Sequence, residues 1–319
     1  MLYVTGSIAY DLIATYDGIF AHAATLSGEH LNMSVLLSGL VRNKGGTAAN
    51  ICYGLAQLNV RSVLIGAVGR DFDDYRRWLE HSGIDTKYVR QFDEELTGMA
   101  FIISDNAGNQ ISSFYPGAMK KARLVKIPTL TEQDLVSVSA NDPDAMHIYC
   151  MEAKRYGARL IFDPGQQTVA FGPDTLKYCV ENADYLLVNQ HEWQIMQRML
   201  GDLSYLSKRL KGIIITLGKN GALFYEGNYV ETVNTLVIES PIDPTGAGDA
   251  FRAGFLAGLV NNLGLKECVR LGCIVSGFCV ESPGTQNYVV DVQALEQRYK
   301  IAYGEPLPKP ITALLGLQK

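Results

Sequence analysis

Short apolar runs rich in β-branched residues recur along the chain, and segments with a helical pattern separate most of them. The runs are LYVT (2–5), SVLIGAVG (62–69), MHIYC (146–150), RLIFD (159–163), YLLVN (185–189) and GIIITL (212–217). Unbroken apolar runs of this length are typical of strands that are buried on both faces. The alternation of such strands with helices predicts an α/β fold, a three-layer α/β/α sandwich around a mostly parallel central sheet.

Two helices are expected beside the second run. TAANICYGLAQLN (47–59) precedes it and DFDDYRRWLEHSG (71–83) follows it. In the later segment Asp71 is expected to cap the start of the helix, and Gly83 is expected to end it.

Two segments interrupt the alternation. Residues from approximately 12 to 42 contain three glycines and no long amphipathic period, and residues 97–117 contain two expected strands around the turn DNAGN (105–109). Because long excursions from a compact core often cover a binding site, we interpret both as a small β-rich lid inserted in a single domain of residues 1–319. Ordinary edge hairpins are the alternative.

Composition narrows the class of protein. The chain has 319 residues, 47% of them hydrophobic, which is enough for a large core. Its net charge is -5 and its 28 basic residues are dispersed, so nucleic acid is not an expected partner. No apolar stretch approaches the roughly 20 residues of a membrane helix, and the chain opens with a strand rather than a signal sequence, which predicts a cytoplasmic protein without a membrane partner. The six cysteines form no C-x-x-C pair, so neither zinc nor a disulfide framework is indicated.

The stretch DPTGAGDAF (243–251) combines two acids, two glycines and the start of an expected helix at Ala250. Gly246 and Gly248 allow backbone N–H groups to converge on an anion, and a helix N-terminus adds its dipole. Asp249 would repel that anion unless it faces another group, such as a hydroxyl that loses its proton. The stretch therefore favours phosphoryl transfer to an alcohol, and an aspartate N-cap after a glycine turn is the structural alternative.

Polar residues follow several of the expected strands, at the edge where open parallel sheets bind ligands. Asp11, DPGQQ (163–167), NQHE (189–192) and GKNGA (218–222) all lie there. A second glycine turn, with Gly45, Gly46 and Asn50, opens a helix and is predicted to hold a polyhydroxyl ligand together with Asp11. The chain lacks the Walker pattern and the Rossmann G-x-G-x-x-G after a strand, which argues against a P-loop ATPase and a dinucleotide-dependent dehydrogenase.

Four motifs taken together resemble the ribokinase (PfkB) family of sugar and nucleoside kinases. They are GG-x-x-x-N (45–50), N-x-x-E (189–192), TLG-x-x-G (216–221) and DPTGAGD (243–249). Further segments resemble bacterial adenosine kinases of the mycobacterial type: GSIAYDLI (6–13), ISSFYPGAM (111–119), ANDPDAM (140–146), DPGQQ (163–167) and ESPGTQ (281–286). The resemblance implies that ATP and Mg²⁺ serve the phosphorylation of adenosine to AMP at the ribose 5′-hydroxyl. A monovalent cation such as K⁺ near Asp243 is known in relatives.

The resemblance also assigns roles by position. It implies that Asp249 is the catalytic base and that the amides of Gly246, Ala247 and Gly248 form the anion hole. For the nucleoside it implies Ser7, Asp11, Gly45, Gly46, Asn50, Gln166 and Gln167, with Phe114 stacked on the purine. Phe101 is a second aromatic candidate that depends on the register of its strand, because a slip of one residue turns a side chain to the other face.

On the ATP side, the resemblance assigns Thr216, Gly218 and Gly221 to the nucleotide loop. Asn189 and Glu192 are implied to organise Mg²⁺ through water. For Asp249, a helix N-terminus is expected to hold the pKa below the ordinary value of about 4.

Several alternatives stay open from the residues alone. The acceptor is adenosine, another nucleoside such as guanosine or inosine, or a sugar, and a catalytically silent nucleoside-binding protein is the candidate from another class. The exposed lid strands favour a homodimer. Arg252 has no assigned role: contact with phosphate and a cap on a helix face are both open.

Overall fold

The computed structural model describes residues 1–27 and 30–316. Its core is a sheet with the order β15-β14-β13-β12-β11-β10-β1-β6-β7 in the described part of the chain. The strands are β1 (Leu2–Thr5), β6 (Val63–Gly69), β7 (Asp85–Phe92), β10 (Leu135–Ser139), β11 (Arg159–Asp163), β12 (Tyr185–Asn189), β13 (Gly212–Thr216), β14 (Ala222–Glu226) and β15 (Tyr229–Val233). Pairing from β13 through β7 is parallel, and β14 and β15 complete the other edge as antiparallel strands.

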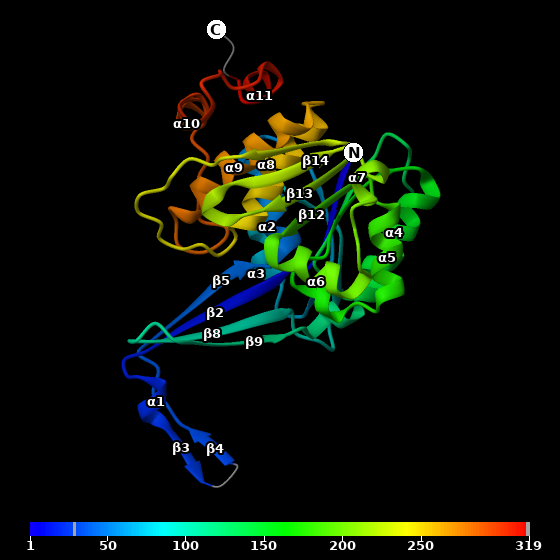
Figure 1. The fold of residues 1–319 in the computed structure, drawn as a ribbon. Coiled ribbons are helices and arrows are strands. Elements are labelled where there is room, and N and C mark those ends of the chain that lie inside the picture. Colours follow the sequence, from blue (N-terminus) through cyan, green and yellow to red (C-terminus); the bar gives the residue numbers. More distant parts are fainter. Residues whose placement is uncertain (28–29, 317–319) are drawn as a thin grey trace.

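Helices cover both faces of this sheet, which confirms the expected three-layer α/β/α fold (Figure 1). One side carries α2 (Thr47–Gln57), α3 (Asp73–His81), α8 (Ala247–Val260), α9 (Leu265–Val280), α10 (Val292–Tyr303) and α11 (Lys309–Leu314). The other side carries the 3₁₀ helices η1 (Gly117–Leu124) and η2 (Gly165–Ala170), with α4 (Pro143–Tyr156), α5 (Pro173–Asn182), α6 (Gln190–Leu200) and α7 (Leu206–Arg209). A third 3₁₀ helix, η3 (Gly218–Asn220), follows β13. No helix in the described residues is long and apolar enough to cross a membrane.

The apolar runs are continuous because each buried strand contributes side chains to two hydrophobic clusters, one on each face of the sheet. In β13, Ile214 packs into the cluster under α2, α8 and α9, whereas its neighbours Ile213 and Ile215 pack into the cluster under α4, α5 and α6. Successive side chains of a strand point to opposite faces, so a strand between two helical layers needs an apolar residue at every position.

A second, four-stranded sheet extends from the core beside the carboxyl ends of the parallel strands (Figure 1). It consists of β2 (Ala9–Tyr16), β5 (Gly39–Gly45), β8 (Gly98–Asp105) and β9 (Gln110–Tyr115), in the order β5-β2-β8-β9. The two strands around DNAGN are thus confirmed. A narrow arm of α1 (Phe20–Ala23), β3 (Ala24–Ser27) and β4 (His30–Met33) continues from the far end. Residues 28 and 29 of the first lid segment lie outside the described residues.

Three local predictions are wrong. MHIYC belongs to helix α4, which Asp142 caps by accepting a hydrogen bond from the Ala145 N–H, and the strand before it is LVSVS of β10. Asp71 does not cap α3, because its carboxylate accepts from the Thr97 N–H at 2.8 Å instead. Helix α8 begins at Ala247, three residues before the expected start, so Asp249 lies inside its first turn and is not its N-cap. Gly83 does end α3, with a φ of 79°.

Candidate active site

The first turn of α8 lies between two cavities at the carboxyl edge of the sheet. The first cavity, of about 420 Å³, is lined by Gly246 and Asp249 on this turn and by residues of the lid sheet. The second, of about 560 Å³, is lined by Ala247 and Gly248 of the same turn. Both volumes are in the range of small-molecule sites. A helix N-terminus between two cavities can bind an anionic group that passes from one ligand to the other.

The second cavity is mostly apolar. Its walls come from α8, α9 and the segment that follows β15, including Leu236, Val237, Ile238, Pro241 and Val280. At one end the cavity meets the predicted nucleotide loop, with Thr216, Gly218 and Gly221. An apolar slot that opens on a glycine turn and a helix N-terminus suits an aromatic base attached to phosphates.

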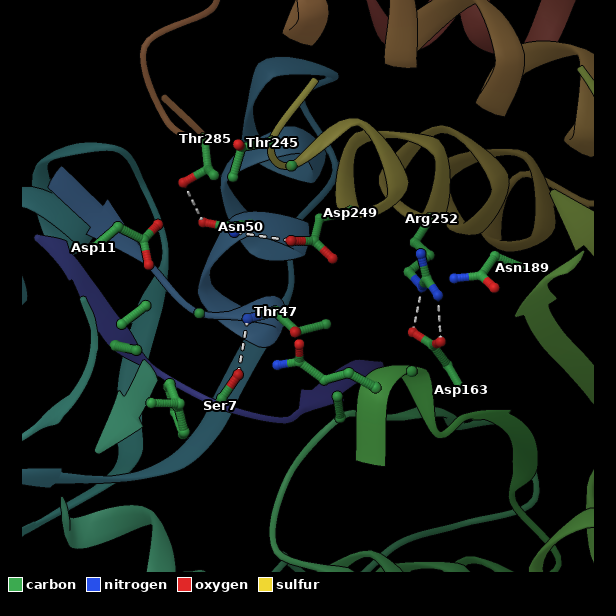
Figure 2. A pocket seen from close by; sticks show the side chains of 18 of the residues that line it. Ser7, Asp11, Thr47, Asn50, Asp163, Asn189, Thr245, Asp249, Arg252 and Thr285 are labelled. Carbon is green, nitrogen blue, oxygen red and sulfur yellow. Dashed lines mark hydrogen bonds and ion pairs between the residues drawn. The ribbon is translucent and has the colours of Figure 1, made fainter. Parts of the chain in front are cut away.

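Asp249 lines the first cavity, and its carboxylate accepts a hydrogen bond from the Asn50 amide (Figure 2). The Asn50 Nδ2 donates to Asp249 Oδ2 at 2.8 Å. The Asn50 Oδ1 accepts from Thr285 Oγ1 at 2.9 Å and from Gln286 Nε2 at 2.8 Å. Because an ionised Asp249 only accepts and the Gln286 amide nitrogen donates to Oδ1, the orientation of the Asn50 amide is fixed, and Asn50 in turn fixes the carboxylate. Its assigned contact with ribose stays a prediction.

The environment of Asp249 corrects the expectation of a low pKa. Burial of the carboxylate raises its pKa to about 6, and the charges of Asp163 and Asp11 act in the same direction. The Arg252 charge and the Asn50 hydrogen bond lower the pKa without cancelling the effect of burial. Desolvation outweighs the helix N-terminus here, and a pKa nearer neutrality makes Asp249 a better base.

The pH dependence of activity follows from that shift. A carboxylate that serves as a base must be ionised, so with Asp249 as the predicted base kcat/KM is expected to be level above pH 7 and to fall by about tenfold per pH unit well below the pKa of about 6. Asp11, also with a pKa of about 6, will steepen the fall if ionised Asp11 binds substrate. The measurement is kcat/KM from pH 5 to pH 9, with circular dichroism as a check that the protein stays folded. A flat profile down to pH 5 would contradict Asp249 as the base.

The predicted sugar-binding residues come together where the four-stranded sheet joins the core. Asp11, Gly46, Asn50 and Ser7 all line the first cavity. Gly45 lies just outside the lining, where a Cβ would stand 2.4 Å from the Asp11 carboxylate. Burial, followed by the nearby Asp243 charge, raises the pKa of Asp11. The Ser7 Oγ accepts from the Thr47 N–H at 3.0 Å and so ties β1 to the start of α2.

Strand register separates the two candidate aromatics. Phe114 pairs with Ala100, and both line the first cavity together with Ile102. Phe101 lies between Ala100 and Ile102 on β8, so its side chain points to the opposite face of the lid. Phe101 is therefore absent from the lining of the first cavity, which leaves Phe114 as the aromatic residue for a purine there, and the assignment of Phe101 stays a prediction. Gln166 lines the cavity, whereas Gln167 is absent from its lining.

Asn189 and Glu192 form a capping box at the start of α6. The Asn189 Oδ1 accepts from the Glu192 N–H at 2.8 Å, and the Glu192 carboxylate accepts from the backbone and side-chain nitrogens of Asn189, both at 2.7 Å. Both residues also line the first cavity. Each carboxylate oxygen keeps a free lone pair, which fits an Mg²⁺ ion held through water. Within the described residues no cluster of three or more acidic, histidine or cysteine side chains forms a direct metal cage.

The structure adds site residues that sequence reasoning did not assign. Asp163 ends β11 and forms a buried ion pair with Arg252, and Thr285 contacts Asn50 beside the anion hole. Asp163 follows an apolar strand directly, so its position at the sheet edge was readable from the sequence. Its pairing with Arg252, 89 residues away, was not.

The comparisons with known proteins agree with this geometry. Residues 1–291 match the model of the pfkB family carbohydrate kinases. The chain is 32% identical over 284 residues to the nucleoside kinase of Methanothermobacter thermautotrophicus, covering 87% of this chain and 91% of that protein.

Two solved structures of the Burkholderia thailandensis nucleoside kinase are also similar. The structure in complex with inosine has a TM-score of 0.86 at 29% identity and covers 96% of this chain and 100% of that one. The ADP-inosine complex has a TM-score of 0.83 at 30% identity and covers 96% and 97%. With the family model across most of the chain and a relative of this identity over most of its length, the protein belongs to the pfkB family of carbohydrate kinases and is a phosphotransferase that acts on a sugar or nucleoside hydroxyl.

Proposed function

We propose that the protein transfers the γ-phosphoryl group of ATP to the 5′-hydroxyl of a purine nucleoside, with adenosine to AMP as the principal reaction. The observation that carries this proposal is the position of Asp249, a carboxylate of raised pKa between a lid-covered cavity and an apolar cavity, beside the amides of Gly246, Ala247 and Gly248. The nucleoside occupies the first cavity and ATP the second.

The reaction follows from these positions. The nucleoside 5′-oxygen forms a bond to the γ-phosphorus, the bond from that phosphorus to the bridging oxygen of ADP breaks with its electron pair leaving on ADP, and the hydroxyl proton passes to Asp249. Asn50 holds the carboxylate in line, which matters more than early proton removal in a loose transition state. The α8 amides stabilise the charge on the transferred group. When bound, Mg²⁺ neutralises phosphate charge, and Glu192 and Asn189 are the residues that would hold it through water.

Adenosine is proposed on the motifs shared with adenosine kinases, and inosine is the second candidate. The similarity to a nucleoside kinase solved in complex with inosine favours the latter. Gln166 lines the first cavity with an amide that can both donate and accept, so it can pair with adenine or with hypoxanthine. A sugar acceptor leaves the aromatic Phe114 without a partner.

A substrate panel tests the proposal. Purified protein with Mg-ATP is given adenosine, inosine, guanosine, ribose and fructose 6-phosphate, and ADP formation is followed. Turnover of adenosine at least tenfold above the others is expected. A preference for inosine or guanosine would retain nucleoside phosphorylation and replace adenosine, a preference for a sugar would reject the purine site, and no turnover would favour a silent binder.

Phe114→Ala is expected to raise the KM for adenosine about tenfold or more, because stacking on an aromatic ring contributes about 1 to 3 kcal/mol per base. Phe101→Ala is the matched control: the two phenylalanines are 39% and 38% exposed but lie on opposite faces of the lid. Steady-state kinetics of both variants, compared in the same oligomeric state, check the prediction. An equal rise in KM for the two variants would place the purine elsewhere.

We also propose that a second copy of the chain covers the outer face of the lid. Leu40, Phe101 and Ile111 lie on that face and are exposed, and β5 and β9 are the edges of the lid sheet. Exposed apolar edge strands pair readily with another copy. Light scattering is expected to give a dimer for the wild type and a monomer for Leu40→Lys. A monomeric wild-type protein at micromolar concentration would contradict this interface.

Two sequence-based expectations have no further support. K⁺ near Asp243 stays a prediction: the Asp243 carboxylate accepts from the Thr245 and Gly284 N–H groups at 2.9 Å each and so joins two loops. A cytoplasmic location also stays a prediction.

A further inference from the structure

Arg252 is a buried cation that forms an ion pair through two of its three guanidinium nitrogens. It lies on α8 three residues after Asp249, and its Nε and Nη2 both donate to the carboxylate of Asp163 at the end of β11 (Figure 2). Arg252 is 9% exposed and Asp163 is 1% exposed. The bidentate pair fixes the plane of the guanidinium, because both groups are planar forks.

The remaining nitrogen, Nη1, lies against Gly248 in the first turn of α8. A Cβ built on Gly248 would stand 2.8 Å from Nη1, so this nitrogen lies directly against a residue whose amide is assigned to the transferred phosphoryl group. In the described part of the chain Nη1 has no hydrogen-bond partner, whereas Nε and Nη2 are both used. A side chain at position 248 would have to displace this end of Arg252.

Negative charge dominates the lining of the first cavity. Its lining contains four carboxylates, Asp11, Asp163, Glu192 and Asp249, and Arg252 is the only lysine or arginine among the described lining residues. With all four carboxylates ionised the lining is net negative even with Arg252, which is the one basic side chain among the described lining residues that can offset the repulsion of an anionic phosphoryl group near Asp249. Guanidinium nitrogens are strong donors to phosphate oxygens, particularly where water is excluded.

We propose that Arg252 is a further catalytic residue, whose Nη1 donates to an oxygen of the transferred phosphoryl group while Asp163 holds the guanidinium in place. The contact stabilises the charge on the three equatorial oxygens as the bond to ADP breaks and the bond to the acceptor oxygen forms. Arg252 takes no proton, because the hydroxyl proton passes to Asp249. The inference rests on the proposed function of this cavity.

The test separates this contact from simple neutralisation of Asp163. Arg252→Gln alone leaves a buried carboxylate unpaired and is expected to lower the unfolding midpoint. Combining it with Asp163→Asn removes both charges and is expected to restore the midpoint while kcat stays about 100-fold below the wild type, the loss typical of one oxyanion donor. Arg252→Lys keeps the charge but has one nitrogen, so its kcat is expected to fall similarly.

Two single variants complete the set. Asp163→Asn keeps Nη1 and is expected to hold kcat within tenfold of the wild type. Arg270→Gln is the matched control, because Arg270 on α9 is as buried as Arg252 and also pairs with a carboxylate, that of Glu305, and its kcat is expected to be unchanged. Wild-type kcat in the double variant would overturn the inference, as would a loss in Asp163→Asn equal to that of the double variant.

Nucleotide binding provides a readout that does not depend on turnover. ATP carries the phosphoryl group that Nη1 contacts and ADP lacks it, so the double variant is expected to lose about tenfold of the affinity for ATP relative to ADP, measured by calorimetry. An unchanged ratio would overturn the inference. A wild type that binds ATP but phosphorylates no acceptor would reject the proposed function and leave the ratio as the test of Arg252.

Discussion

Asp249→Asn is expected to lower kcat by about 1,000-fold, within the range for loss of a positioned general base, while the KM for the nucleoside changes little. The variant removes the proton acceptor and the charge that orients the hydroxyl. It keeps the shape of the side chain, and its amide oxygen still accepts from Asn50 Nδ2. The measurement is steady-state kinetics at pH 8, where Asp249 of the wild type is ionised.

Stability supplies the control for that variant. The folded-state pKa of Asp249, about 6, lies above the ordinary value of 3.8. Ionising Asp249 therefore destabilises the folded protein, and this loss of stability develops as the pH rises through the interval between the two values. A neutral asparagine avoids the cost, and the melting temperature at pH 8 is expected to equal or exceed that of the wild type. A fall in kcat of less than tenfold in a folded variant would reject Asp249 as the base.

Gly46→Ala is expected to lower the free energy of unfolding by more than about 3 kcal/mol and to abolish nucleoside binding. Gly46 has a φ of 93°, which side chains rarely adopt, and a Cβ there would lie 2.6 Å from the Ala9 nitrogen and 2.7 Å from both Ile8 Cα and the Ser7 carbonyl oxygen. All three are backbone atoms, so no rotamer change relieves the overlap. The strands and helix that place Asp11 and Asn50 would have to move.

Gly83→Ala separates strain from overlap. Gly83 has a φ of 79°, but a Cβ there meets nothing within 4 Å. Its substitution is expected to cost about 1 to 2 kcal/mol, the strain alone, and to leave the KM for the nucleoside unchanged. Urea unfolding of both variants checks the pair. Equal losses of stability would show that the close approach at Gly46 is relieved by movement of the backbone.

The sequence predicted the three layers of this fold because strands that are buried on both faces appear in it as continuous apolar runs. A strand such as GIIITL needs an apolar residue at every position. Such a run has no polar positions at the spacing of an amphipathic helix, so it is read as a strand. The same rule failed at MHIYC. Met146, Tyr149, Cys150 and Ala153 are buried at helical spacing, and Asp142 caps the helix, so periodicity and capping outweighed a short apolar run.

The motifs identified the candidate site residues. Their pKa values and the directions of their side chains depend on the three-dimensional fold. The raised pKa of Asp249 arises from burial, which no local pattern encodes. The face that Phe101 occupies depends on the register of β8, and one residue decides it. The setting of Arg252 depends on its ion pair with Asp163, which is 89 residues away in the sequence and leaves no local pattern.

Comparison of adenosine with 5′-deoxyadenosine tests most directly whether the phosphoryl group is transferred to the 5′-oxygen. Mg-ATP and the protein are incubated with each compound, and the products are followed by phosphorus NMR. AMP is expected from adenosine, whereas 5′-deoxyadenosine, which keeps the base and both ribose hydroxyls of the ring, is expected to bind and give no nucleotide. Phosphorylation of 5′-deoxyadenosine, or no AMP from adenosine, would contradict the account.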